Sequence, residues 1–382
     1  MARYRLIDGL RGLAALLVLL SHVGFWTGAD NLDLSGGLLA RGDSGVAVFF
    51  AISAFLLLRP WLAAGATGAQ PPAIRTYALR RAARILPAYL ITLAVVLLVA
   101  GTWGAVGGGG IGGPGKVLAH LLLVQGYADT SYQSFSQTWS ITTEATFYLL
   151  VPVIGTALGR LLRASARRVY AVLAGVVLIG LVSQAATAAW TRHAPATHAG
   201  VLGTSVIGHA AWFAAGAALA VAVQTGALQR LRSVGVGTWL AAAAVVYLFA
   251  SSGIAGPRDL LAPTIAQAVT KEALYTLIAG LLLLAAVRGP SDERWQALAG
   301  SSVNRFAGDI SYGVFLWHVL VLQVIYRASG WQLFTGPLSA VLFAVLVFSV
   351  LIAWASASLV EQPVLRRVHR RTRRAPVPAP PG

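Results

Sequence analysis

Long apolar segments separated by short polar loops dominate this sequence and restrict the folds open to it. Hydrophobic residues make up 57% of the 382 residues and charged residues only 11%, against about 25% charged residues in a soluble domain. A backbone that crosses lipid must satisfy its own hydrogen bonds, and a helix does so within one segment. We therefore predict an all-α fold, a polytopic transmembrane helix bundle. The ten predicted spans are 8–26, 44–63, 85–103, 137–158, 169–190, 205–223, 237–252, 273–288, 309–328 and 336–359.

One further apolar segment, 117–126, reads VLAHLLLVQG. It is too short to cross a bilayer, because a spanning helix needs about 20 residues. We expect a surface or re-entrant helix packed against the bundle.

The distribution of basic residues predicts the orientation of the bundle. With the N-terminus inside, only six of the 29 Lys and Arg residues lie in outside segments, and the other 23 lie in cytoplasmic ones. Such a bias indicates that both termini are cytoplasmic. The net charge of +17 then reflects topology, and we expect no nucleic-acid partner. The predicted transmembrane domain, 1–363, is followed by a basic and Pro-rich tail, 364–382, which we expect to contact anionic lipid.

Arginine accounts for nearly all of the basic residues, since Lys116 and Lys271 are the only lysines. This usage is typical of a GC-rich bacterial genome. We therefore expect a multi-pass protein of the bacterial cytoplasmic membrane.

The first predicted span, RLIDGLRGLAALLVLLSHVGFW, carries three ionisable residues on one side. Arg11 and His22 are separated by about 20° around a helix, and Asp8 lies about 40° from His22. If the hydrocarbon begins near Leu13, His22 lies about 13 Å deep, close to the midplane. Membranes tolerate such a residue only where it faces a bundle interior or a cavity. The stripe is thus a candidate site, and a histidine bonded to a neighbouring helix is the structural alternative.

Two arginines form a second candidate site in RTYALRRAARILPAYL. Arg81 and Arg84 are three residues apart, hence on one helical face, where the third span begins. A guanidinium group suits phosphate because it donates two parallel charge-assisted hydrogen bonds. Positive residues are also ordinary at cytoplasmic helix ends, so topology alone could explain the pair.

A carboxylate lies inside the fourth predicted span, in TWSITTEATFYLLVP. Glu144 has Trp139 before it at the interface and Tyr148 one turn later on the same face. A carboxylate in a membrane interior costs a few kcal/mol, so we expect it to have a partner. That partner could be a catalytic histidine or an arginine such as Arg41.

Other polar residues in the spans are weaker candidates. Tyr312 and His318 occur in GDISYGVFLWHVLVL, where an aromatic and a histidine could also be interface anchors. We expect Ser53, in VFFAISAFLL, to bond to its own helix. The chain has no cysteine, and its histidines lack the spacing of metal ligands, so we predict no metal site.

Taken in order, these segments resemble acyltransferase family 3. The resemblance rests on RLIDGLRGLAALLVLLSH, GVAVFFAISAFLL, RRAARILPAY, WSITTEATFYLLVP, ISYGVFLWH and the tripeptide EQP at 361–363, and it extends over about residues 5–363. The family comprises integral-membrane O-acyltransferases of bacterial surface glycans and also macrolide acyltransferases of actinomycetes. This chain departs from the family at Ala54, where glycine is usual. Many members continue into an extracytoplasmic esterase-like domain, which we do not expect here.

The resemblance implies a donor, an acceptor and site residues. The donor would be an acyl-CoA such as acetyl-CoA on the cytoplasmic side, and the acceptor a hydroxyl of a carbohydrate or a macrolide. His22 would be the catalytic histidine, with Arg11 nearby. Arg81 and Arg84 match the paired arginines thought to engage CoA, and Glu144 matches the acidic residue of the tryptophan–serine motif.

One mechanism fits both the residues and the resemblance. Neutral His22 would take the proton from the acceptor hydroxyl, which attacks the thioester directly. Glu144 or Asp8 could orient the imidazole ring, as in a triad. The candidate substrate contacts are Ser53, Trp139, Tyr148, Tyr312 and His318.

The competing hypothesis is a proton-coupled secondary transporter. Asp8, His22 and Glu144 would then relay protons through the membrane. The absence of a recognisable inverted repeat and the presence of the arginine pair favour the enzyme.

Overall fold

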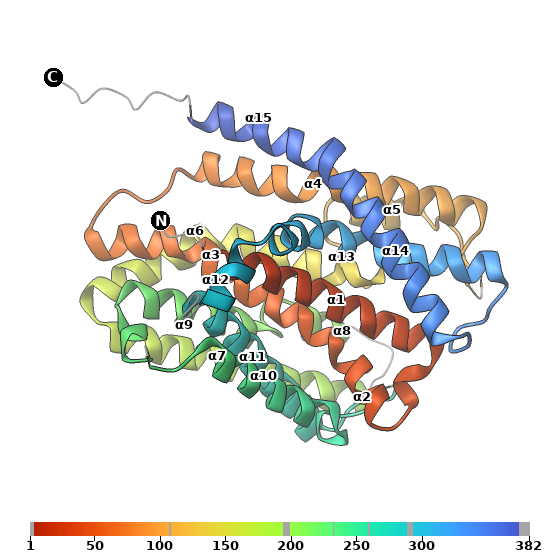
Figure 1. Ribbon diagram of the computed structural model, residues 1–382, viewed down its shortest axis with the longest axis horizontal. Coiled ribbons are helices and arrows are strands. Elements are labelled where there is room, and N and C mark those ends of the chain that lie inside the picture. The colour runs from red at the N-terminus through yellow and green to blue at the C-terminus, as the bar shows by residue number, and fades with distance from the viewer. Residues whose placement is uncertain are drawn as a thin grey trace.

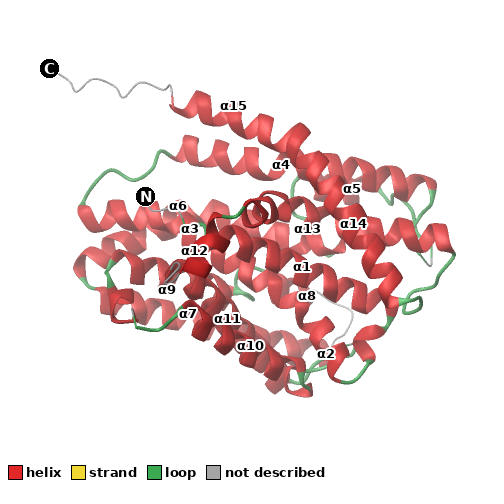
Figure 2. Ribbon diagram, viewed as in Figure 1, coloured by secondary structure: helices red, strands yellow, loops and turns green. Residues whose placement is uncertain are grey.

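The computed structural model describes residues 4–106, 108–193, 199–231, 233–258, 260–288 and 293–373. Every regular element in these ranges is a helix (Figure 2), which confirms the predicted all-α class. Residues 374–382 of the predicted tail lie outside the described ranges. The α-helices are α1 (Leu6–Thr27), α2 (Leu34–Ala40), α3 (Gly45–Thr67), α4 (Ile74–Thr102), α5 (Pro114–Leu121), α6 (Trp139–Ala164), α7 (Ala166–His193), α8 (Ala199–Thr204), α9 (Ala210–Gln224), α10 (Val236–Ser251), α11 (Ile265–Arg288), α12 (Glu293–Gly300), α13 (Ser302–Ser329), α14 (Leu338–Ser356) and α15 (Gln362–Arg373).

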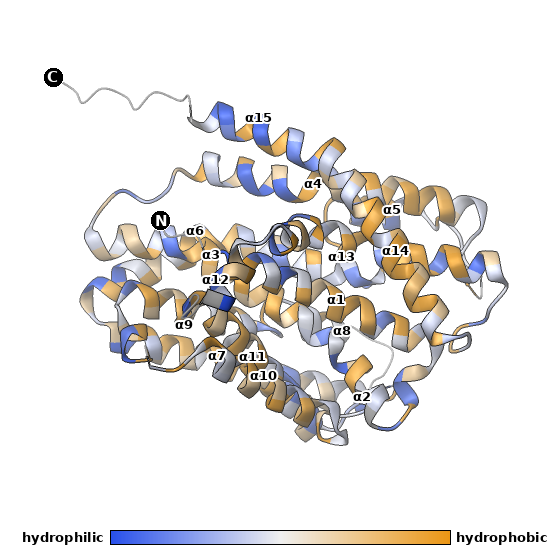
Figure 3. Ribbon diagram, viewed as in Figure 1, coloured by the Kyte–Doolittle hydropathy of each residue, from blue (hydrophilic) through white to orange (hydrophobic). Residues whose placement is uncertain are grey.

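The long helices run roughly parallel to one axis of the molecule and carry most of its apolar residues (Figures 1 and 3). Among the described residues, eight helical stretches are long and apolar enough to cross a membrane. The shorter apolar helices α9 and α10 occupy the positions of the sixth and seventh predicted spans. All ten predicted segments are therefore helices, and the chain is a multi-pass membrane protein.

Several helices extend beyond the predicted spans, and α4 and α14 with its continuation do so by the most residues. Helix α4 begins at Ile74, before the predicted start at residue 85, because the arginine-rich segment ahead of the apolar residues is itself helical. Arginine favours helix nearly as well as leucine does. Helix α14 continues through a π-helical turn, Ala357–Glu361, directly into α15. The short apolar segment forms α5, whose His120 carbonyl oxygen accepts a 3.0 Å hydrogen bond from the Tyr89 hydroxyl of α4.

Close packing of α1 against α13, and of α3 against α6 and α9, builds the centre of the bundle. Small residues permit this approach, as is usual between membrane helices. Gly216 of α9 faces the backbone of α3, where a Cβ atom would overlap the carbonyl oxygen of Ala51. The α3–α9 contact is therefore sensitive to side-chain volume at Gly216.

We expect Gly216→Ala to destabilise the protein by about 1–3 kcal/mol, because the added methyl group forces α9 away from the α3 backbone. Gly175→Ala is the matched control, since Gly175 lies in α7 and a Cβ atom there meets nothing within 4 Å. Thermal unfolding in detergent should show a lower Tm for Gly216→Ala only. Equal melting of the two variants would contradict the proposed close contact.

Candidate active site

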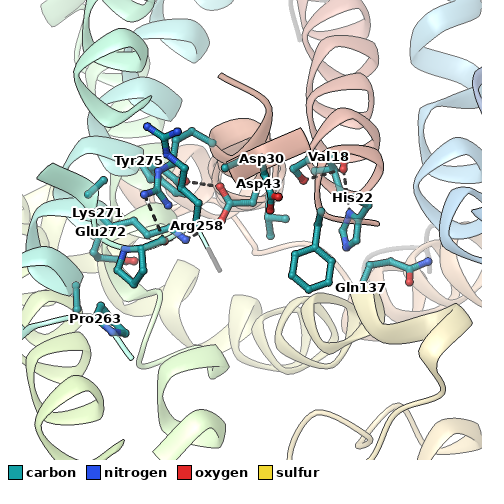
Figure 4. A pocket seen from close by; sticks show the side chains of 18 of the residues that line it. Val18, His22, Asp30, Asp43, Gln137, Arg258, Pro263, Lys271, Glu272 and Tyr275 are labelled. Carbon is teal, nitrogen blue, oxygen red and sulfur yellow. Dashed lines mark hydrogen bonds and ion pairs between the residues drawn. The ribbon is translucent and has the colours of Figure 1, made fainter. Parts of the chain in front are cut away.

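Two cavities contain most of the candidate site residues. The first, which we call the histidine cavity, has a volume of about 560 Å³ (Figure 4). Helices α1, α6, α9 and α11 all contribute to its wall. The polar and aromatic residues that line it include His22, Asp43, Gln137, Trp139, His209, Trp212, Lys271, Glu272 and Tyr275.

The second cavity, which we call the arginine cavity, has a volume of about 300 Å³. Helices α1, α3, α4, α6, α13 and α15 form it. It contains seven of the residues singled out from the sequence, namely Arg11, Ser53, Arg81, Arg84, Glu144, Tyr148 and Tyr312. The structure therefore gathers most of the predicted site residues here, and His22 and Trp139 in the histidine cavity.

The His22 ring is held by its own helix and by a second histidine. Its Nδ1 lies 2.9 Å from the carbonyl oxygen of Val18 and 3.3 Å from Nε2 of His318. The two rings meet edge to face, with centroids 4.9 Å apart. A carbonyl oxygen only accepts hydrogen bonds, so Nδ1 of His22 carries the proton in the neutral ring. Nε2 is then the unprotonated nitrogen.

His318 has the complementary arrangement. It is fully buried, and its Nδ1 donates to the carbonyl oxygen of Val314 at 3.0 Å. The Nε2 atom of the neutral ring is therefore an acceptor, and it faces Nδ1 of His22. A proton added to Nε2 of His22 would leave a cation whose Nδ1–H donates to both Val18 and His318. This pair can thus take up a proton at Nε2 of His22 without rearranging.

Glu144 lies in the arginine cavity, bonded to two hydroxyl groups. Its Oε1 accepts from Ser53 at 2.5 Å and from Tyr148 at 2.7 Å. Tyr148 lies one turn along α6, as the sequence indicates. The expectation that Ser53 bonds to its own helix is wrong, because the carboxylate across the α3–α6 contact is a stronger acceptor.

Neither expected partner of Glu144 is near it. The Arg41 guanidinium donates to the carbonyl oxygens of Ala250 and Gly256 beside the histidine cavity. Glu144 shares its cavity with Arg11, which lies about 16 Å along α1 from His22. The structure thus does not bring Glu144 to the His22 ring. It corrects the orienting arrangement predicted from the sequence, because His318 occupies the position beside Nδ1.

Asp8 is also remote from the His22 ring. It lies in the first turn of α1, about 21 Å along the helix from His22. Gly308 of α13 packs directly against Asp8, and a Cβ atom on Gly308 would meet the Asp8 Cβ and backbone. Asp8 is not among the residues that line either cavity. The helical period relates Asp8 and His22 around the axis of α1, but it carries no information about what each turn packs against.

The arginine cavity carries an excess of positive charge. Four arginines line it, Arg11, Arg80, Arg81 and Arg84, against the single carboxylate of Glu144. None of the four forms an ion pair with a carboxylate among the residues that the structure describes. Arg81 and Arg84 each lie over an aromatic ring, Tyr148 and Tyr312 respectively, at 5.9 Å from the ring centroid.

Arg81 also has an unused donor. Its Nε is buried and has no hydrogen-bond partner among the residues that the structure describes. A buried unpaired donor is costly, and a charged one more so. An anionic ligand with several oxygen acceptors would relieve both the charge excess and the missing hydrogen bond.

Aromatic side chains lie between the arginine cavity and the histidine pair. Phe49 lines the arginine cavity and packs edge to face against Phe315, with centroids 5.9 Å apart. Phe315 in turn lies 6.1 Å from the His318 ring. These two rings thus link the wall of the arginine cavity to the histidine pair.

Comparison with known proteins identifies the family. A family model described as an acyltransferase domain, that of acyltransferase family 3, matches residues 4–358. The chain belongs to this family. It is therefore a membrane acyltransferase, and the transporter hypothesis has no support from the comparison. No protein of curated function and no solved structure matches the sequence.

The acyltransferase has a second histidine in the histidine cavity that sequence analysis did not select. His209 Nδ1 lies 3.1 Å from Oε2 of Glu272, which is 3% exposed. The His209 ring stacks on Trp212, with centroids 3.7 Å apart. These residues come from α11 and from the segment around α9, distant in sequence. The usable signal was Lys271-Glu272, a charged pair just ahead of the predicted span 273–288.

A charged network forms another part of the same cavity wall. Lys271 Nζ lies 2.7 Å from Oδ2 of Asp43, and the Tyr275 hydroxyl donates to Oδ1 of Asp43. Figure 4 shows this network across the cavity from His22. Within the described part of the chain, no three His, Asp or Glu side chains form a group that could hold a metal ion.

Proposed function

We propose that this acyltransferase transfers a short acyl group, such as acetyl, from cytosolic acyl-CoA to a hydroxyl of a sugar or a glycosylated macrolide. His22 is the general base in this proposal. The observation that carries it is the hydrogen bonding of Nδ1 to Val18 and His318. Because Nδ1 is occupied, Nε2 is the basic nitrogen of a ring that lines a cavity large enough for a small ligand.

The proposed reaction is a single direct transfer. Nε2 of His22 takes the proton of the acceptor hydroxyl while the hydroxyl oxygen bonds to the thioester carbonyl carbon. The bond from that carbon to the CoA sulfur then breaks. The proton passes from His22 to the leaving thiolate, so the products are the O-acyl ester and free CoA. Direct transfer needs no enzyme nucleophile, which agrees with the absence of cysteine from the chain.

The charge of the arginine cavity supports an acyl-CoA donor. CoA carries a diphosphate and a separate 3′-phosphate, and guanidinium groups bind such oxygens in pairs. Arg81 and Arg84 would hold the phosphates, and Arg11 lies deeper along α1 toward His22. The pantetheine arm is narrow enough to extend past Phe49 and Phe315 toward the histidine pair.

Unpaired polar atoms in the histidine cavity support a hydroxylated acceptor. The Trp212 indole nitrogen, Oε1 of Glu272 and Oε1 of Gln137 are buried and have no hydrogen-bond partners in the described part of the chain. All three residues line the cavity, and each is at most 5% exposed. A hydroxyl group both donates and accepts, so several hydroxyls on one ring would satisfy donors and acceptors together. Trp139 and Trp212 add apolar faces against which such a ring can pack.

Turnover by the purified protein tests the proposal. Wild-type protein in detergent is incubated with acetyl-CoA and a panel of sugars and glycosylated macrolides, and free CoA and acylated product are measured by mass. Product that accumulates in step with free CoA supports the proposal and names the acceptor. Failure to bind any acyl-CoA in a parallel binding measurement would overturn it, because a proton-coupled transporter needs no such ligand.

We expect His318→Phe to lower kcat about 10- to 100-fold, because the His22 cation loses one hydrogen-bond acceptor. His318→Gln, which keeps an acceptor oxygen, should recover part of the loss. KM for the acceptor and the affinity for acetyl-CoA should stay unchanged, since His318 touches His22 rather than a substrate. Steady-state kinetics of the two variants check this, and equal losses in both would contradict a hydrogen-bonding role.

A further inference from the structure

The basic helix α15 is part of the wall of the arginine cavity. Leu365 and His369, one turn apart on α15, line this cavity together with Arg80, Arg81 and Arg84. Leu365 and His369 also line a neighbouring cavity of about 240 Å³, as do Arg84 and Arg366. The two cavities therefore meet at Arg84 and α15.

Helix α15 is fixed to α4 at its far end. Arg80 donates from Nε and Nη2 to the Thr372 hydroxyl, at 3.3 and 3.1 Å. The two helices pack side by side, as Figure 1 shows, and hydrophilic residues of both helices lie close to one another in Figure 3. Two positively charged helices repel each other unless anions lie between them. Their contact is thus a candidate place for an anionic ligand.

The π-helical turn before α15 directs the helix to this position. Glu361 ends that turn, is 1% exposed, and lines the neighbouring cavity. Its Oε2 has no hydrogen-bond partner within the described ranges. Turns of this type inside α-helices are frequent at functional sites. The turn thus belongs to the same cavity as Arg84, Arg366 and His369.

The volume of the arginine cavity requires a ligand of CoA size to extend out of it. A cavity of about 300 Å³ is at the small end of the range for drug-sized ligands, and CoA is larger than these. The nucleotide end must therefore lie at the mouth, which α15 borders. Arg366 and His369 are exposed at that border.

We propose that the cavity-facing side of α15, formed by Leu365, Arg366 and His369, is part of the donor site and binds phosphate groups of the CoA nucleotide. This inference rests on the proposed acyl-CoA donor. It gives the basic segment a role other than the lipid contact expected from its composition. Phosphate is the chemistry shared by CoA and anionic lipid headgroups, so the experiment has to separate the two sources.

The test compares two double variants of the full-length protein that each remove two basic side chains of α15. Arg366→Ala with His369→Ala removes the cavity-facing pair. Arg367→Ala with Arg371→Ala is the matched control, because these exposed arginines line neither cavity. Calorimetry measures binding of CoA and of pantetheine, which lacks the nucleotide phosphates. Each measurement is made in detergent and in nanodiscs of zwitterionic or anionic lipid.

We expect the cavity-facing pair to weaken CoA binding about tenfold or more, and the control pair to change it less than about twofold. The two double variants should bind pantetheine with equal affinity. The difference between them in CoA affinity should be the same in detergent and in both kinds of nanodisc. The single variant Arg366→Glu provides a second check and should weaken CoA binding at least as much as the cavity-facing double variant does. Thermal unfolding verifies that all variants are folded.

Two outcomes overturn the inference and differ in what else they overturn. In the first, wild type binds CoA, and either both double variants weaken CoA binding equally or the weakening occurs only in anionic lipid. The helix α15 is then a lipid contact, and the donor proposal still stands. If wild type binds no CoA in any medium, the donor proposal itself fails and the role of α15 fails with it.

Discussion

Replacing His22 with alanine is expected to lower the rate of acyl transfer about 10²- to 10⁴-fold, the usual contribution of a general base. The loss should be in kcat, because the arginine cavity that would hold acyl-CoA lies about 16 Å from His22 along α1. Acetyl-CoA affinity should therefore equal that of wild type. The measurement is product formation by mass under saturating acetyl-CoA, together with calorimetric binding of CoA.

His193→Ala is the matched control, because His193 is an exposed histidine at the end of α7. It should retain wild-type turnover. If His22→Ala retains activity as well, the general base is another residue. His209 is then the first to test, since it lines the same cavity and Glu272 holds its Nδ1.

The second large effect is expected from the double variant Arg81→Ala with Arg84→Ala. Each guanidinium would make a charge-assisted hydrogen bond of about 1.5–3 kcal/mol to a phosphate, so the pair should weaken acyl-CoA binding about 10²- to 10⁴-fold. This loss of affinity should depend less on ionic strength than the loss of a surface contact would, because Arg81 is partly buried and salt screens it less. Calorimetric titration with acetyl-CoA measures it directly.

A control with the same change in charge is Arg75→Ala with Arg305→Ala. Arg75, in α4, and Arg305, in α13, are both exposed and line neither of the two main cavities. Their loss should leave the acetyl-CoA affinity within about twofold of wild type. If both double variants bind acetyl-CoA as wild type does, the arginine pair serves topology, and the donor site lies elsewhere.

The proposed donor and acceptor sites are lined by different side chains, and this has a consequence for specificity. The acyl chain would enter past Phe49 and Phe315, whereas the acceptor would enter beside Trp139 and Trp212. Acyl length and acceptor identity are then controlled by different side chains. Substitutions at the phenylalanines should change the donors that are used without changing the acceptors.

The sequence predicted relations within one helix better than relations between helices. The helical period correctly placed Arg81 and Arg84 on one face, and Tyr148 one turn from Glu144, because both relations are local to one helix. The pairing of Glu144 with Ser53, and of His22 with His318, joins different helices. Their relative height depends on interhelical contacts, and periodicity within one helix carries no information about these.

The residues missed altogether share the same physical cause. Glu272 and His209 are distant in sequence and meet only because α11 and the segment before α9 pack together. Leu365 and His369 join the arginine cavity only because α15 packs along α4. The charged pair Lys271-Glu272 was the one local signal for the first group, whereas nothing local in the basic segment around Leu365 and His369 distinguished a cavity wall from an ordinary cytoplasmic helix end.

Composition and hydrophobic pattern by themselves determined that this chain is a multi-helix membrane protein, because lipid leaves the backbone few other ways to satisfy its hydrogen bonds. The ordered motifs also determined its family. Tertiary structure alone decided that His318 is the residue beside Nδ1 of His22, and that four arginines and α15 surround one cavity. Those relations depend on how far each helix is displaced along its neighbours, which close packing of small residues sets and a single helix cannot encode.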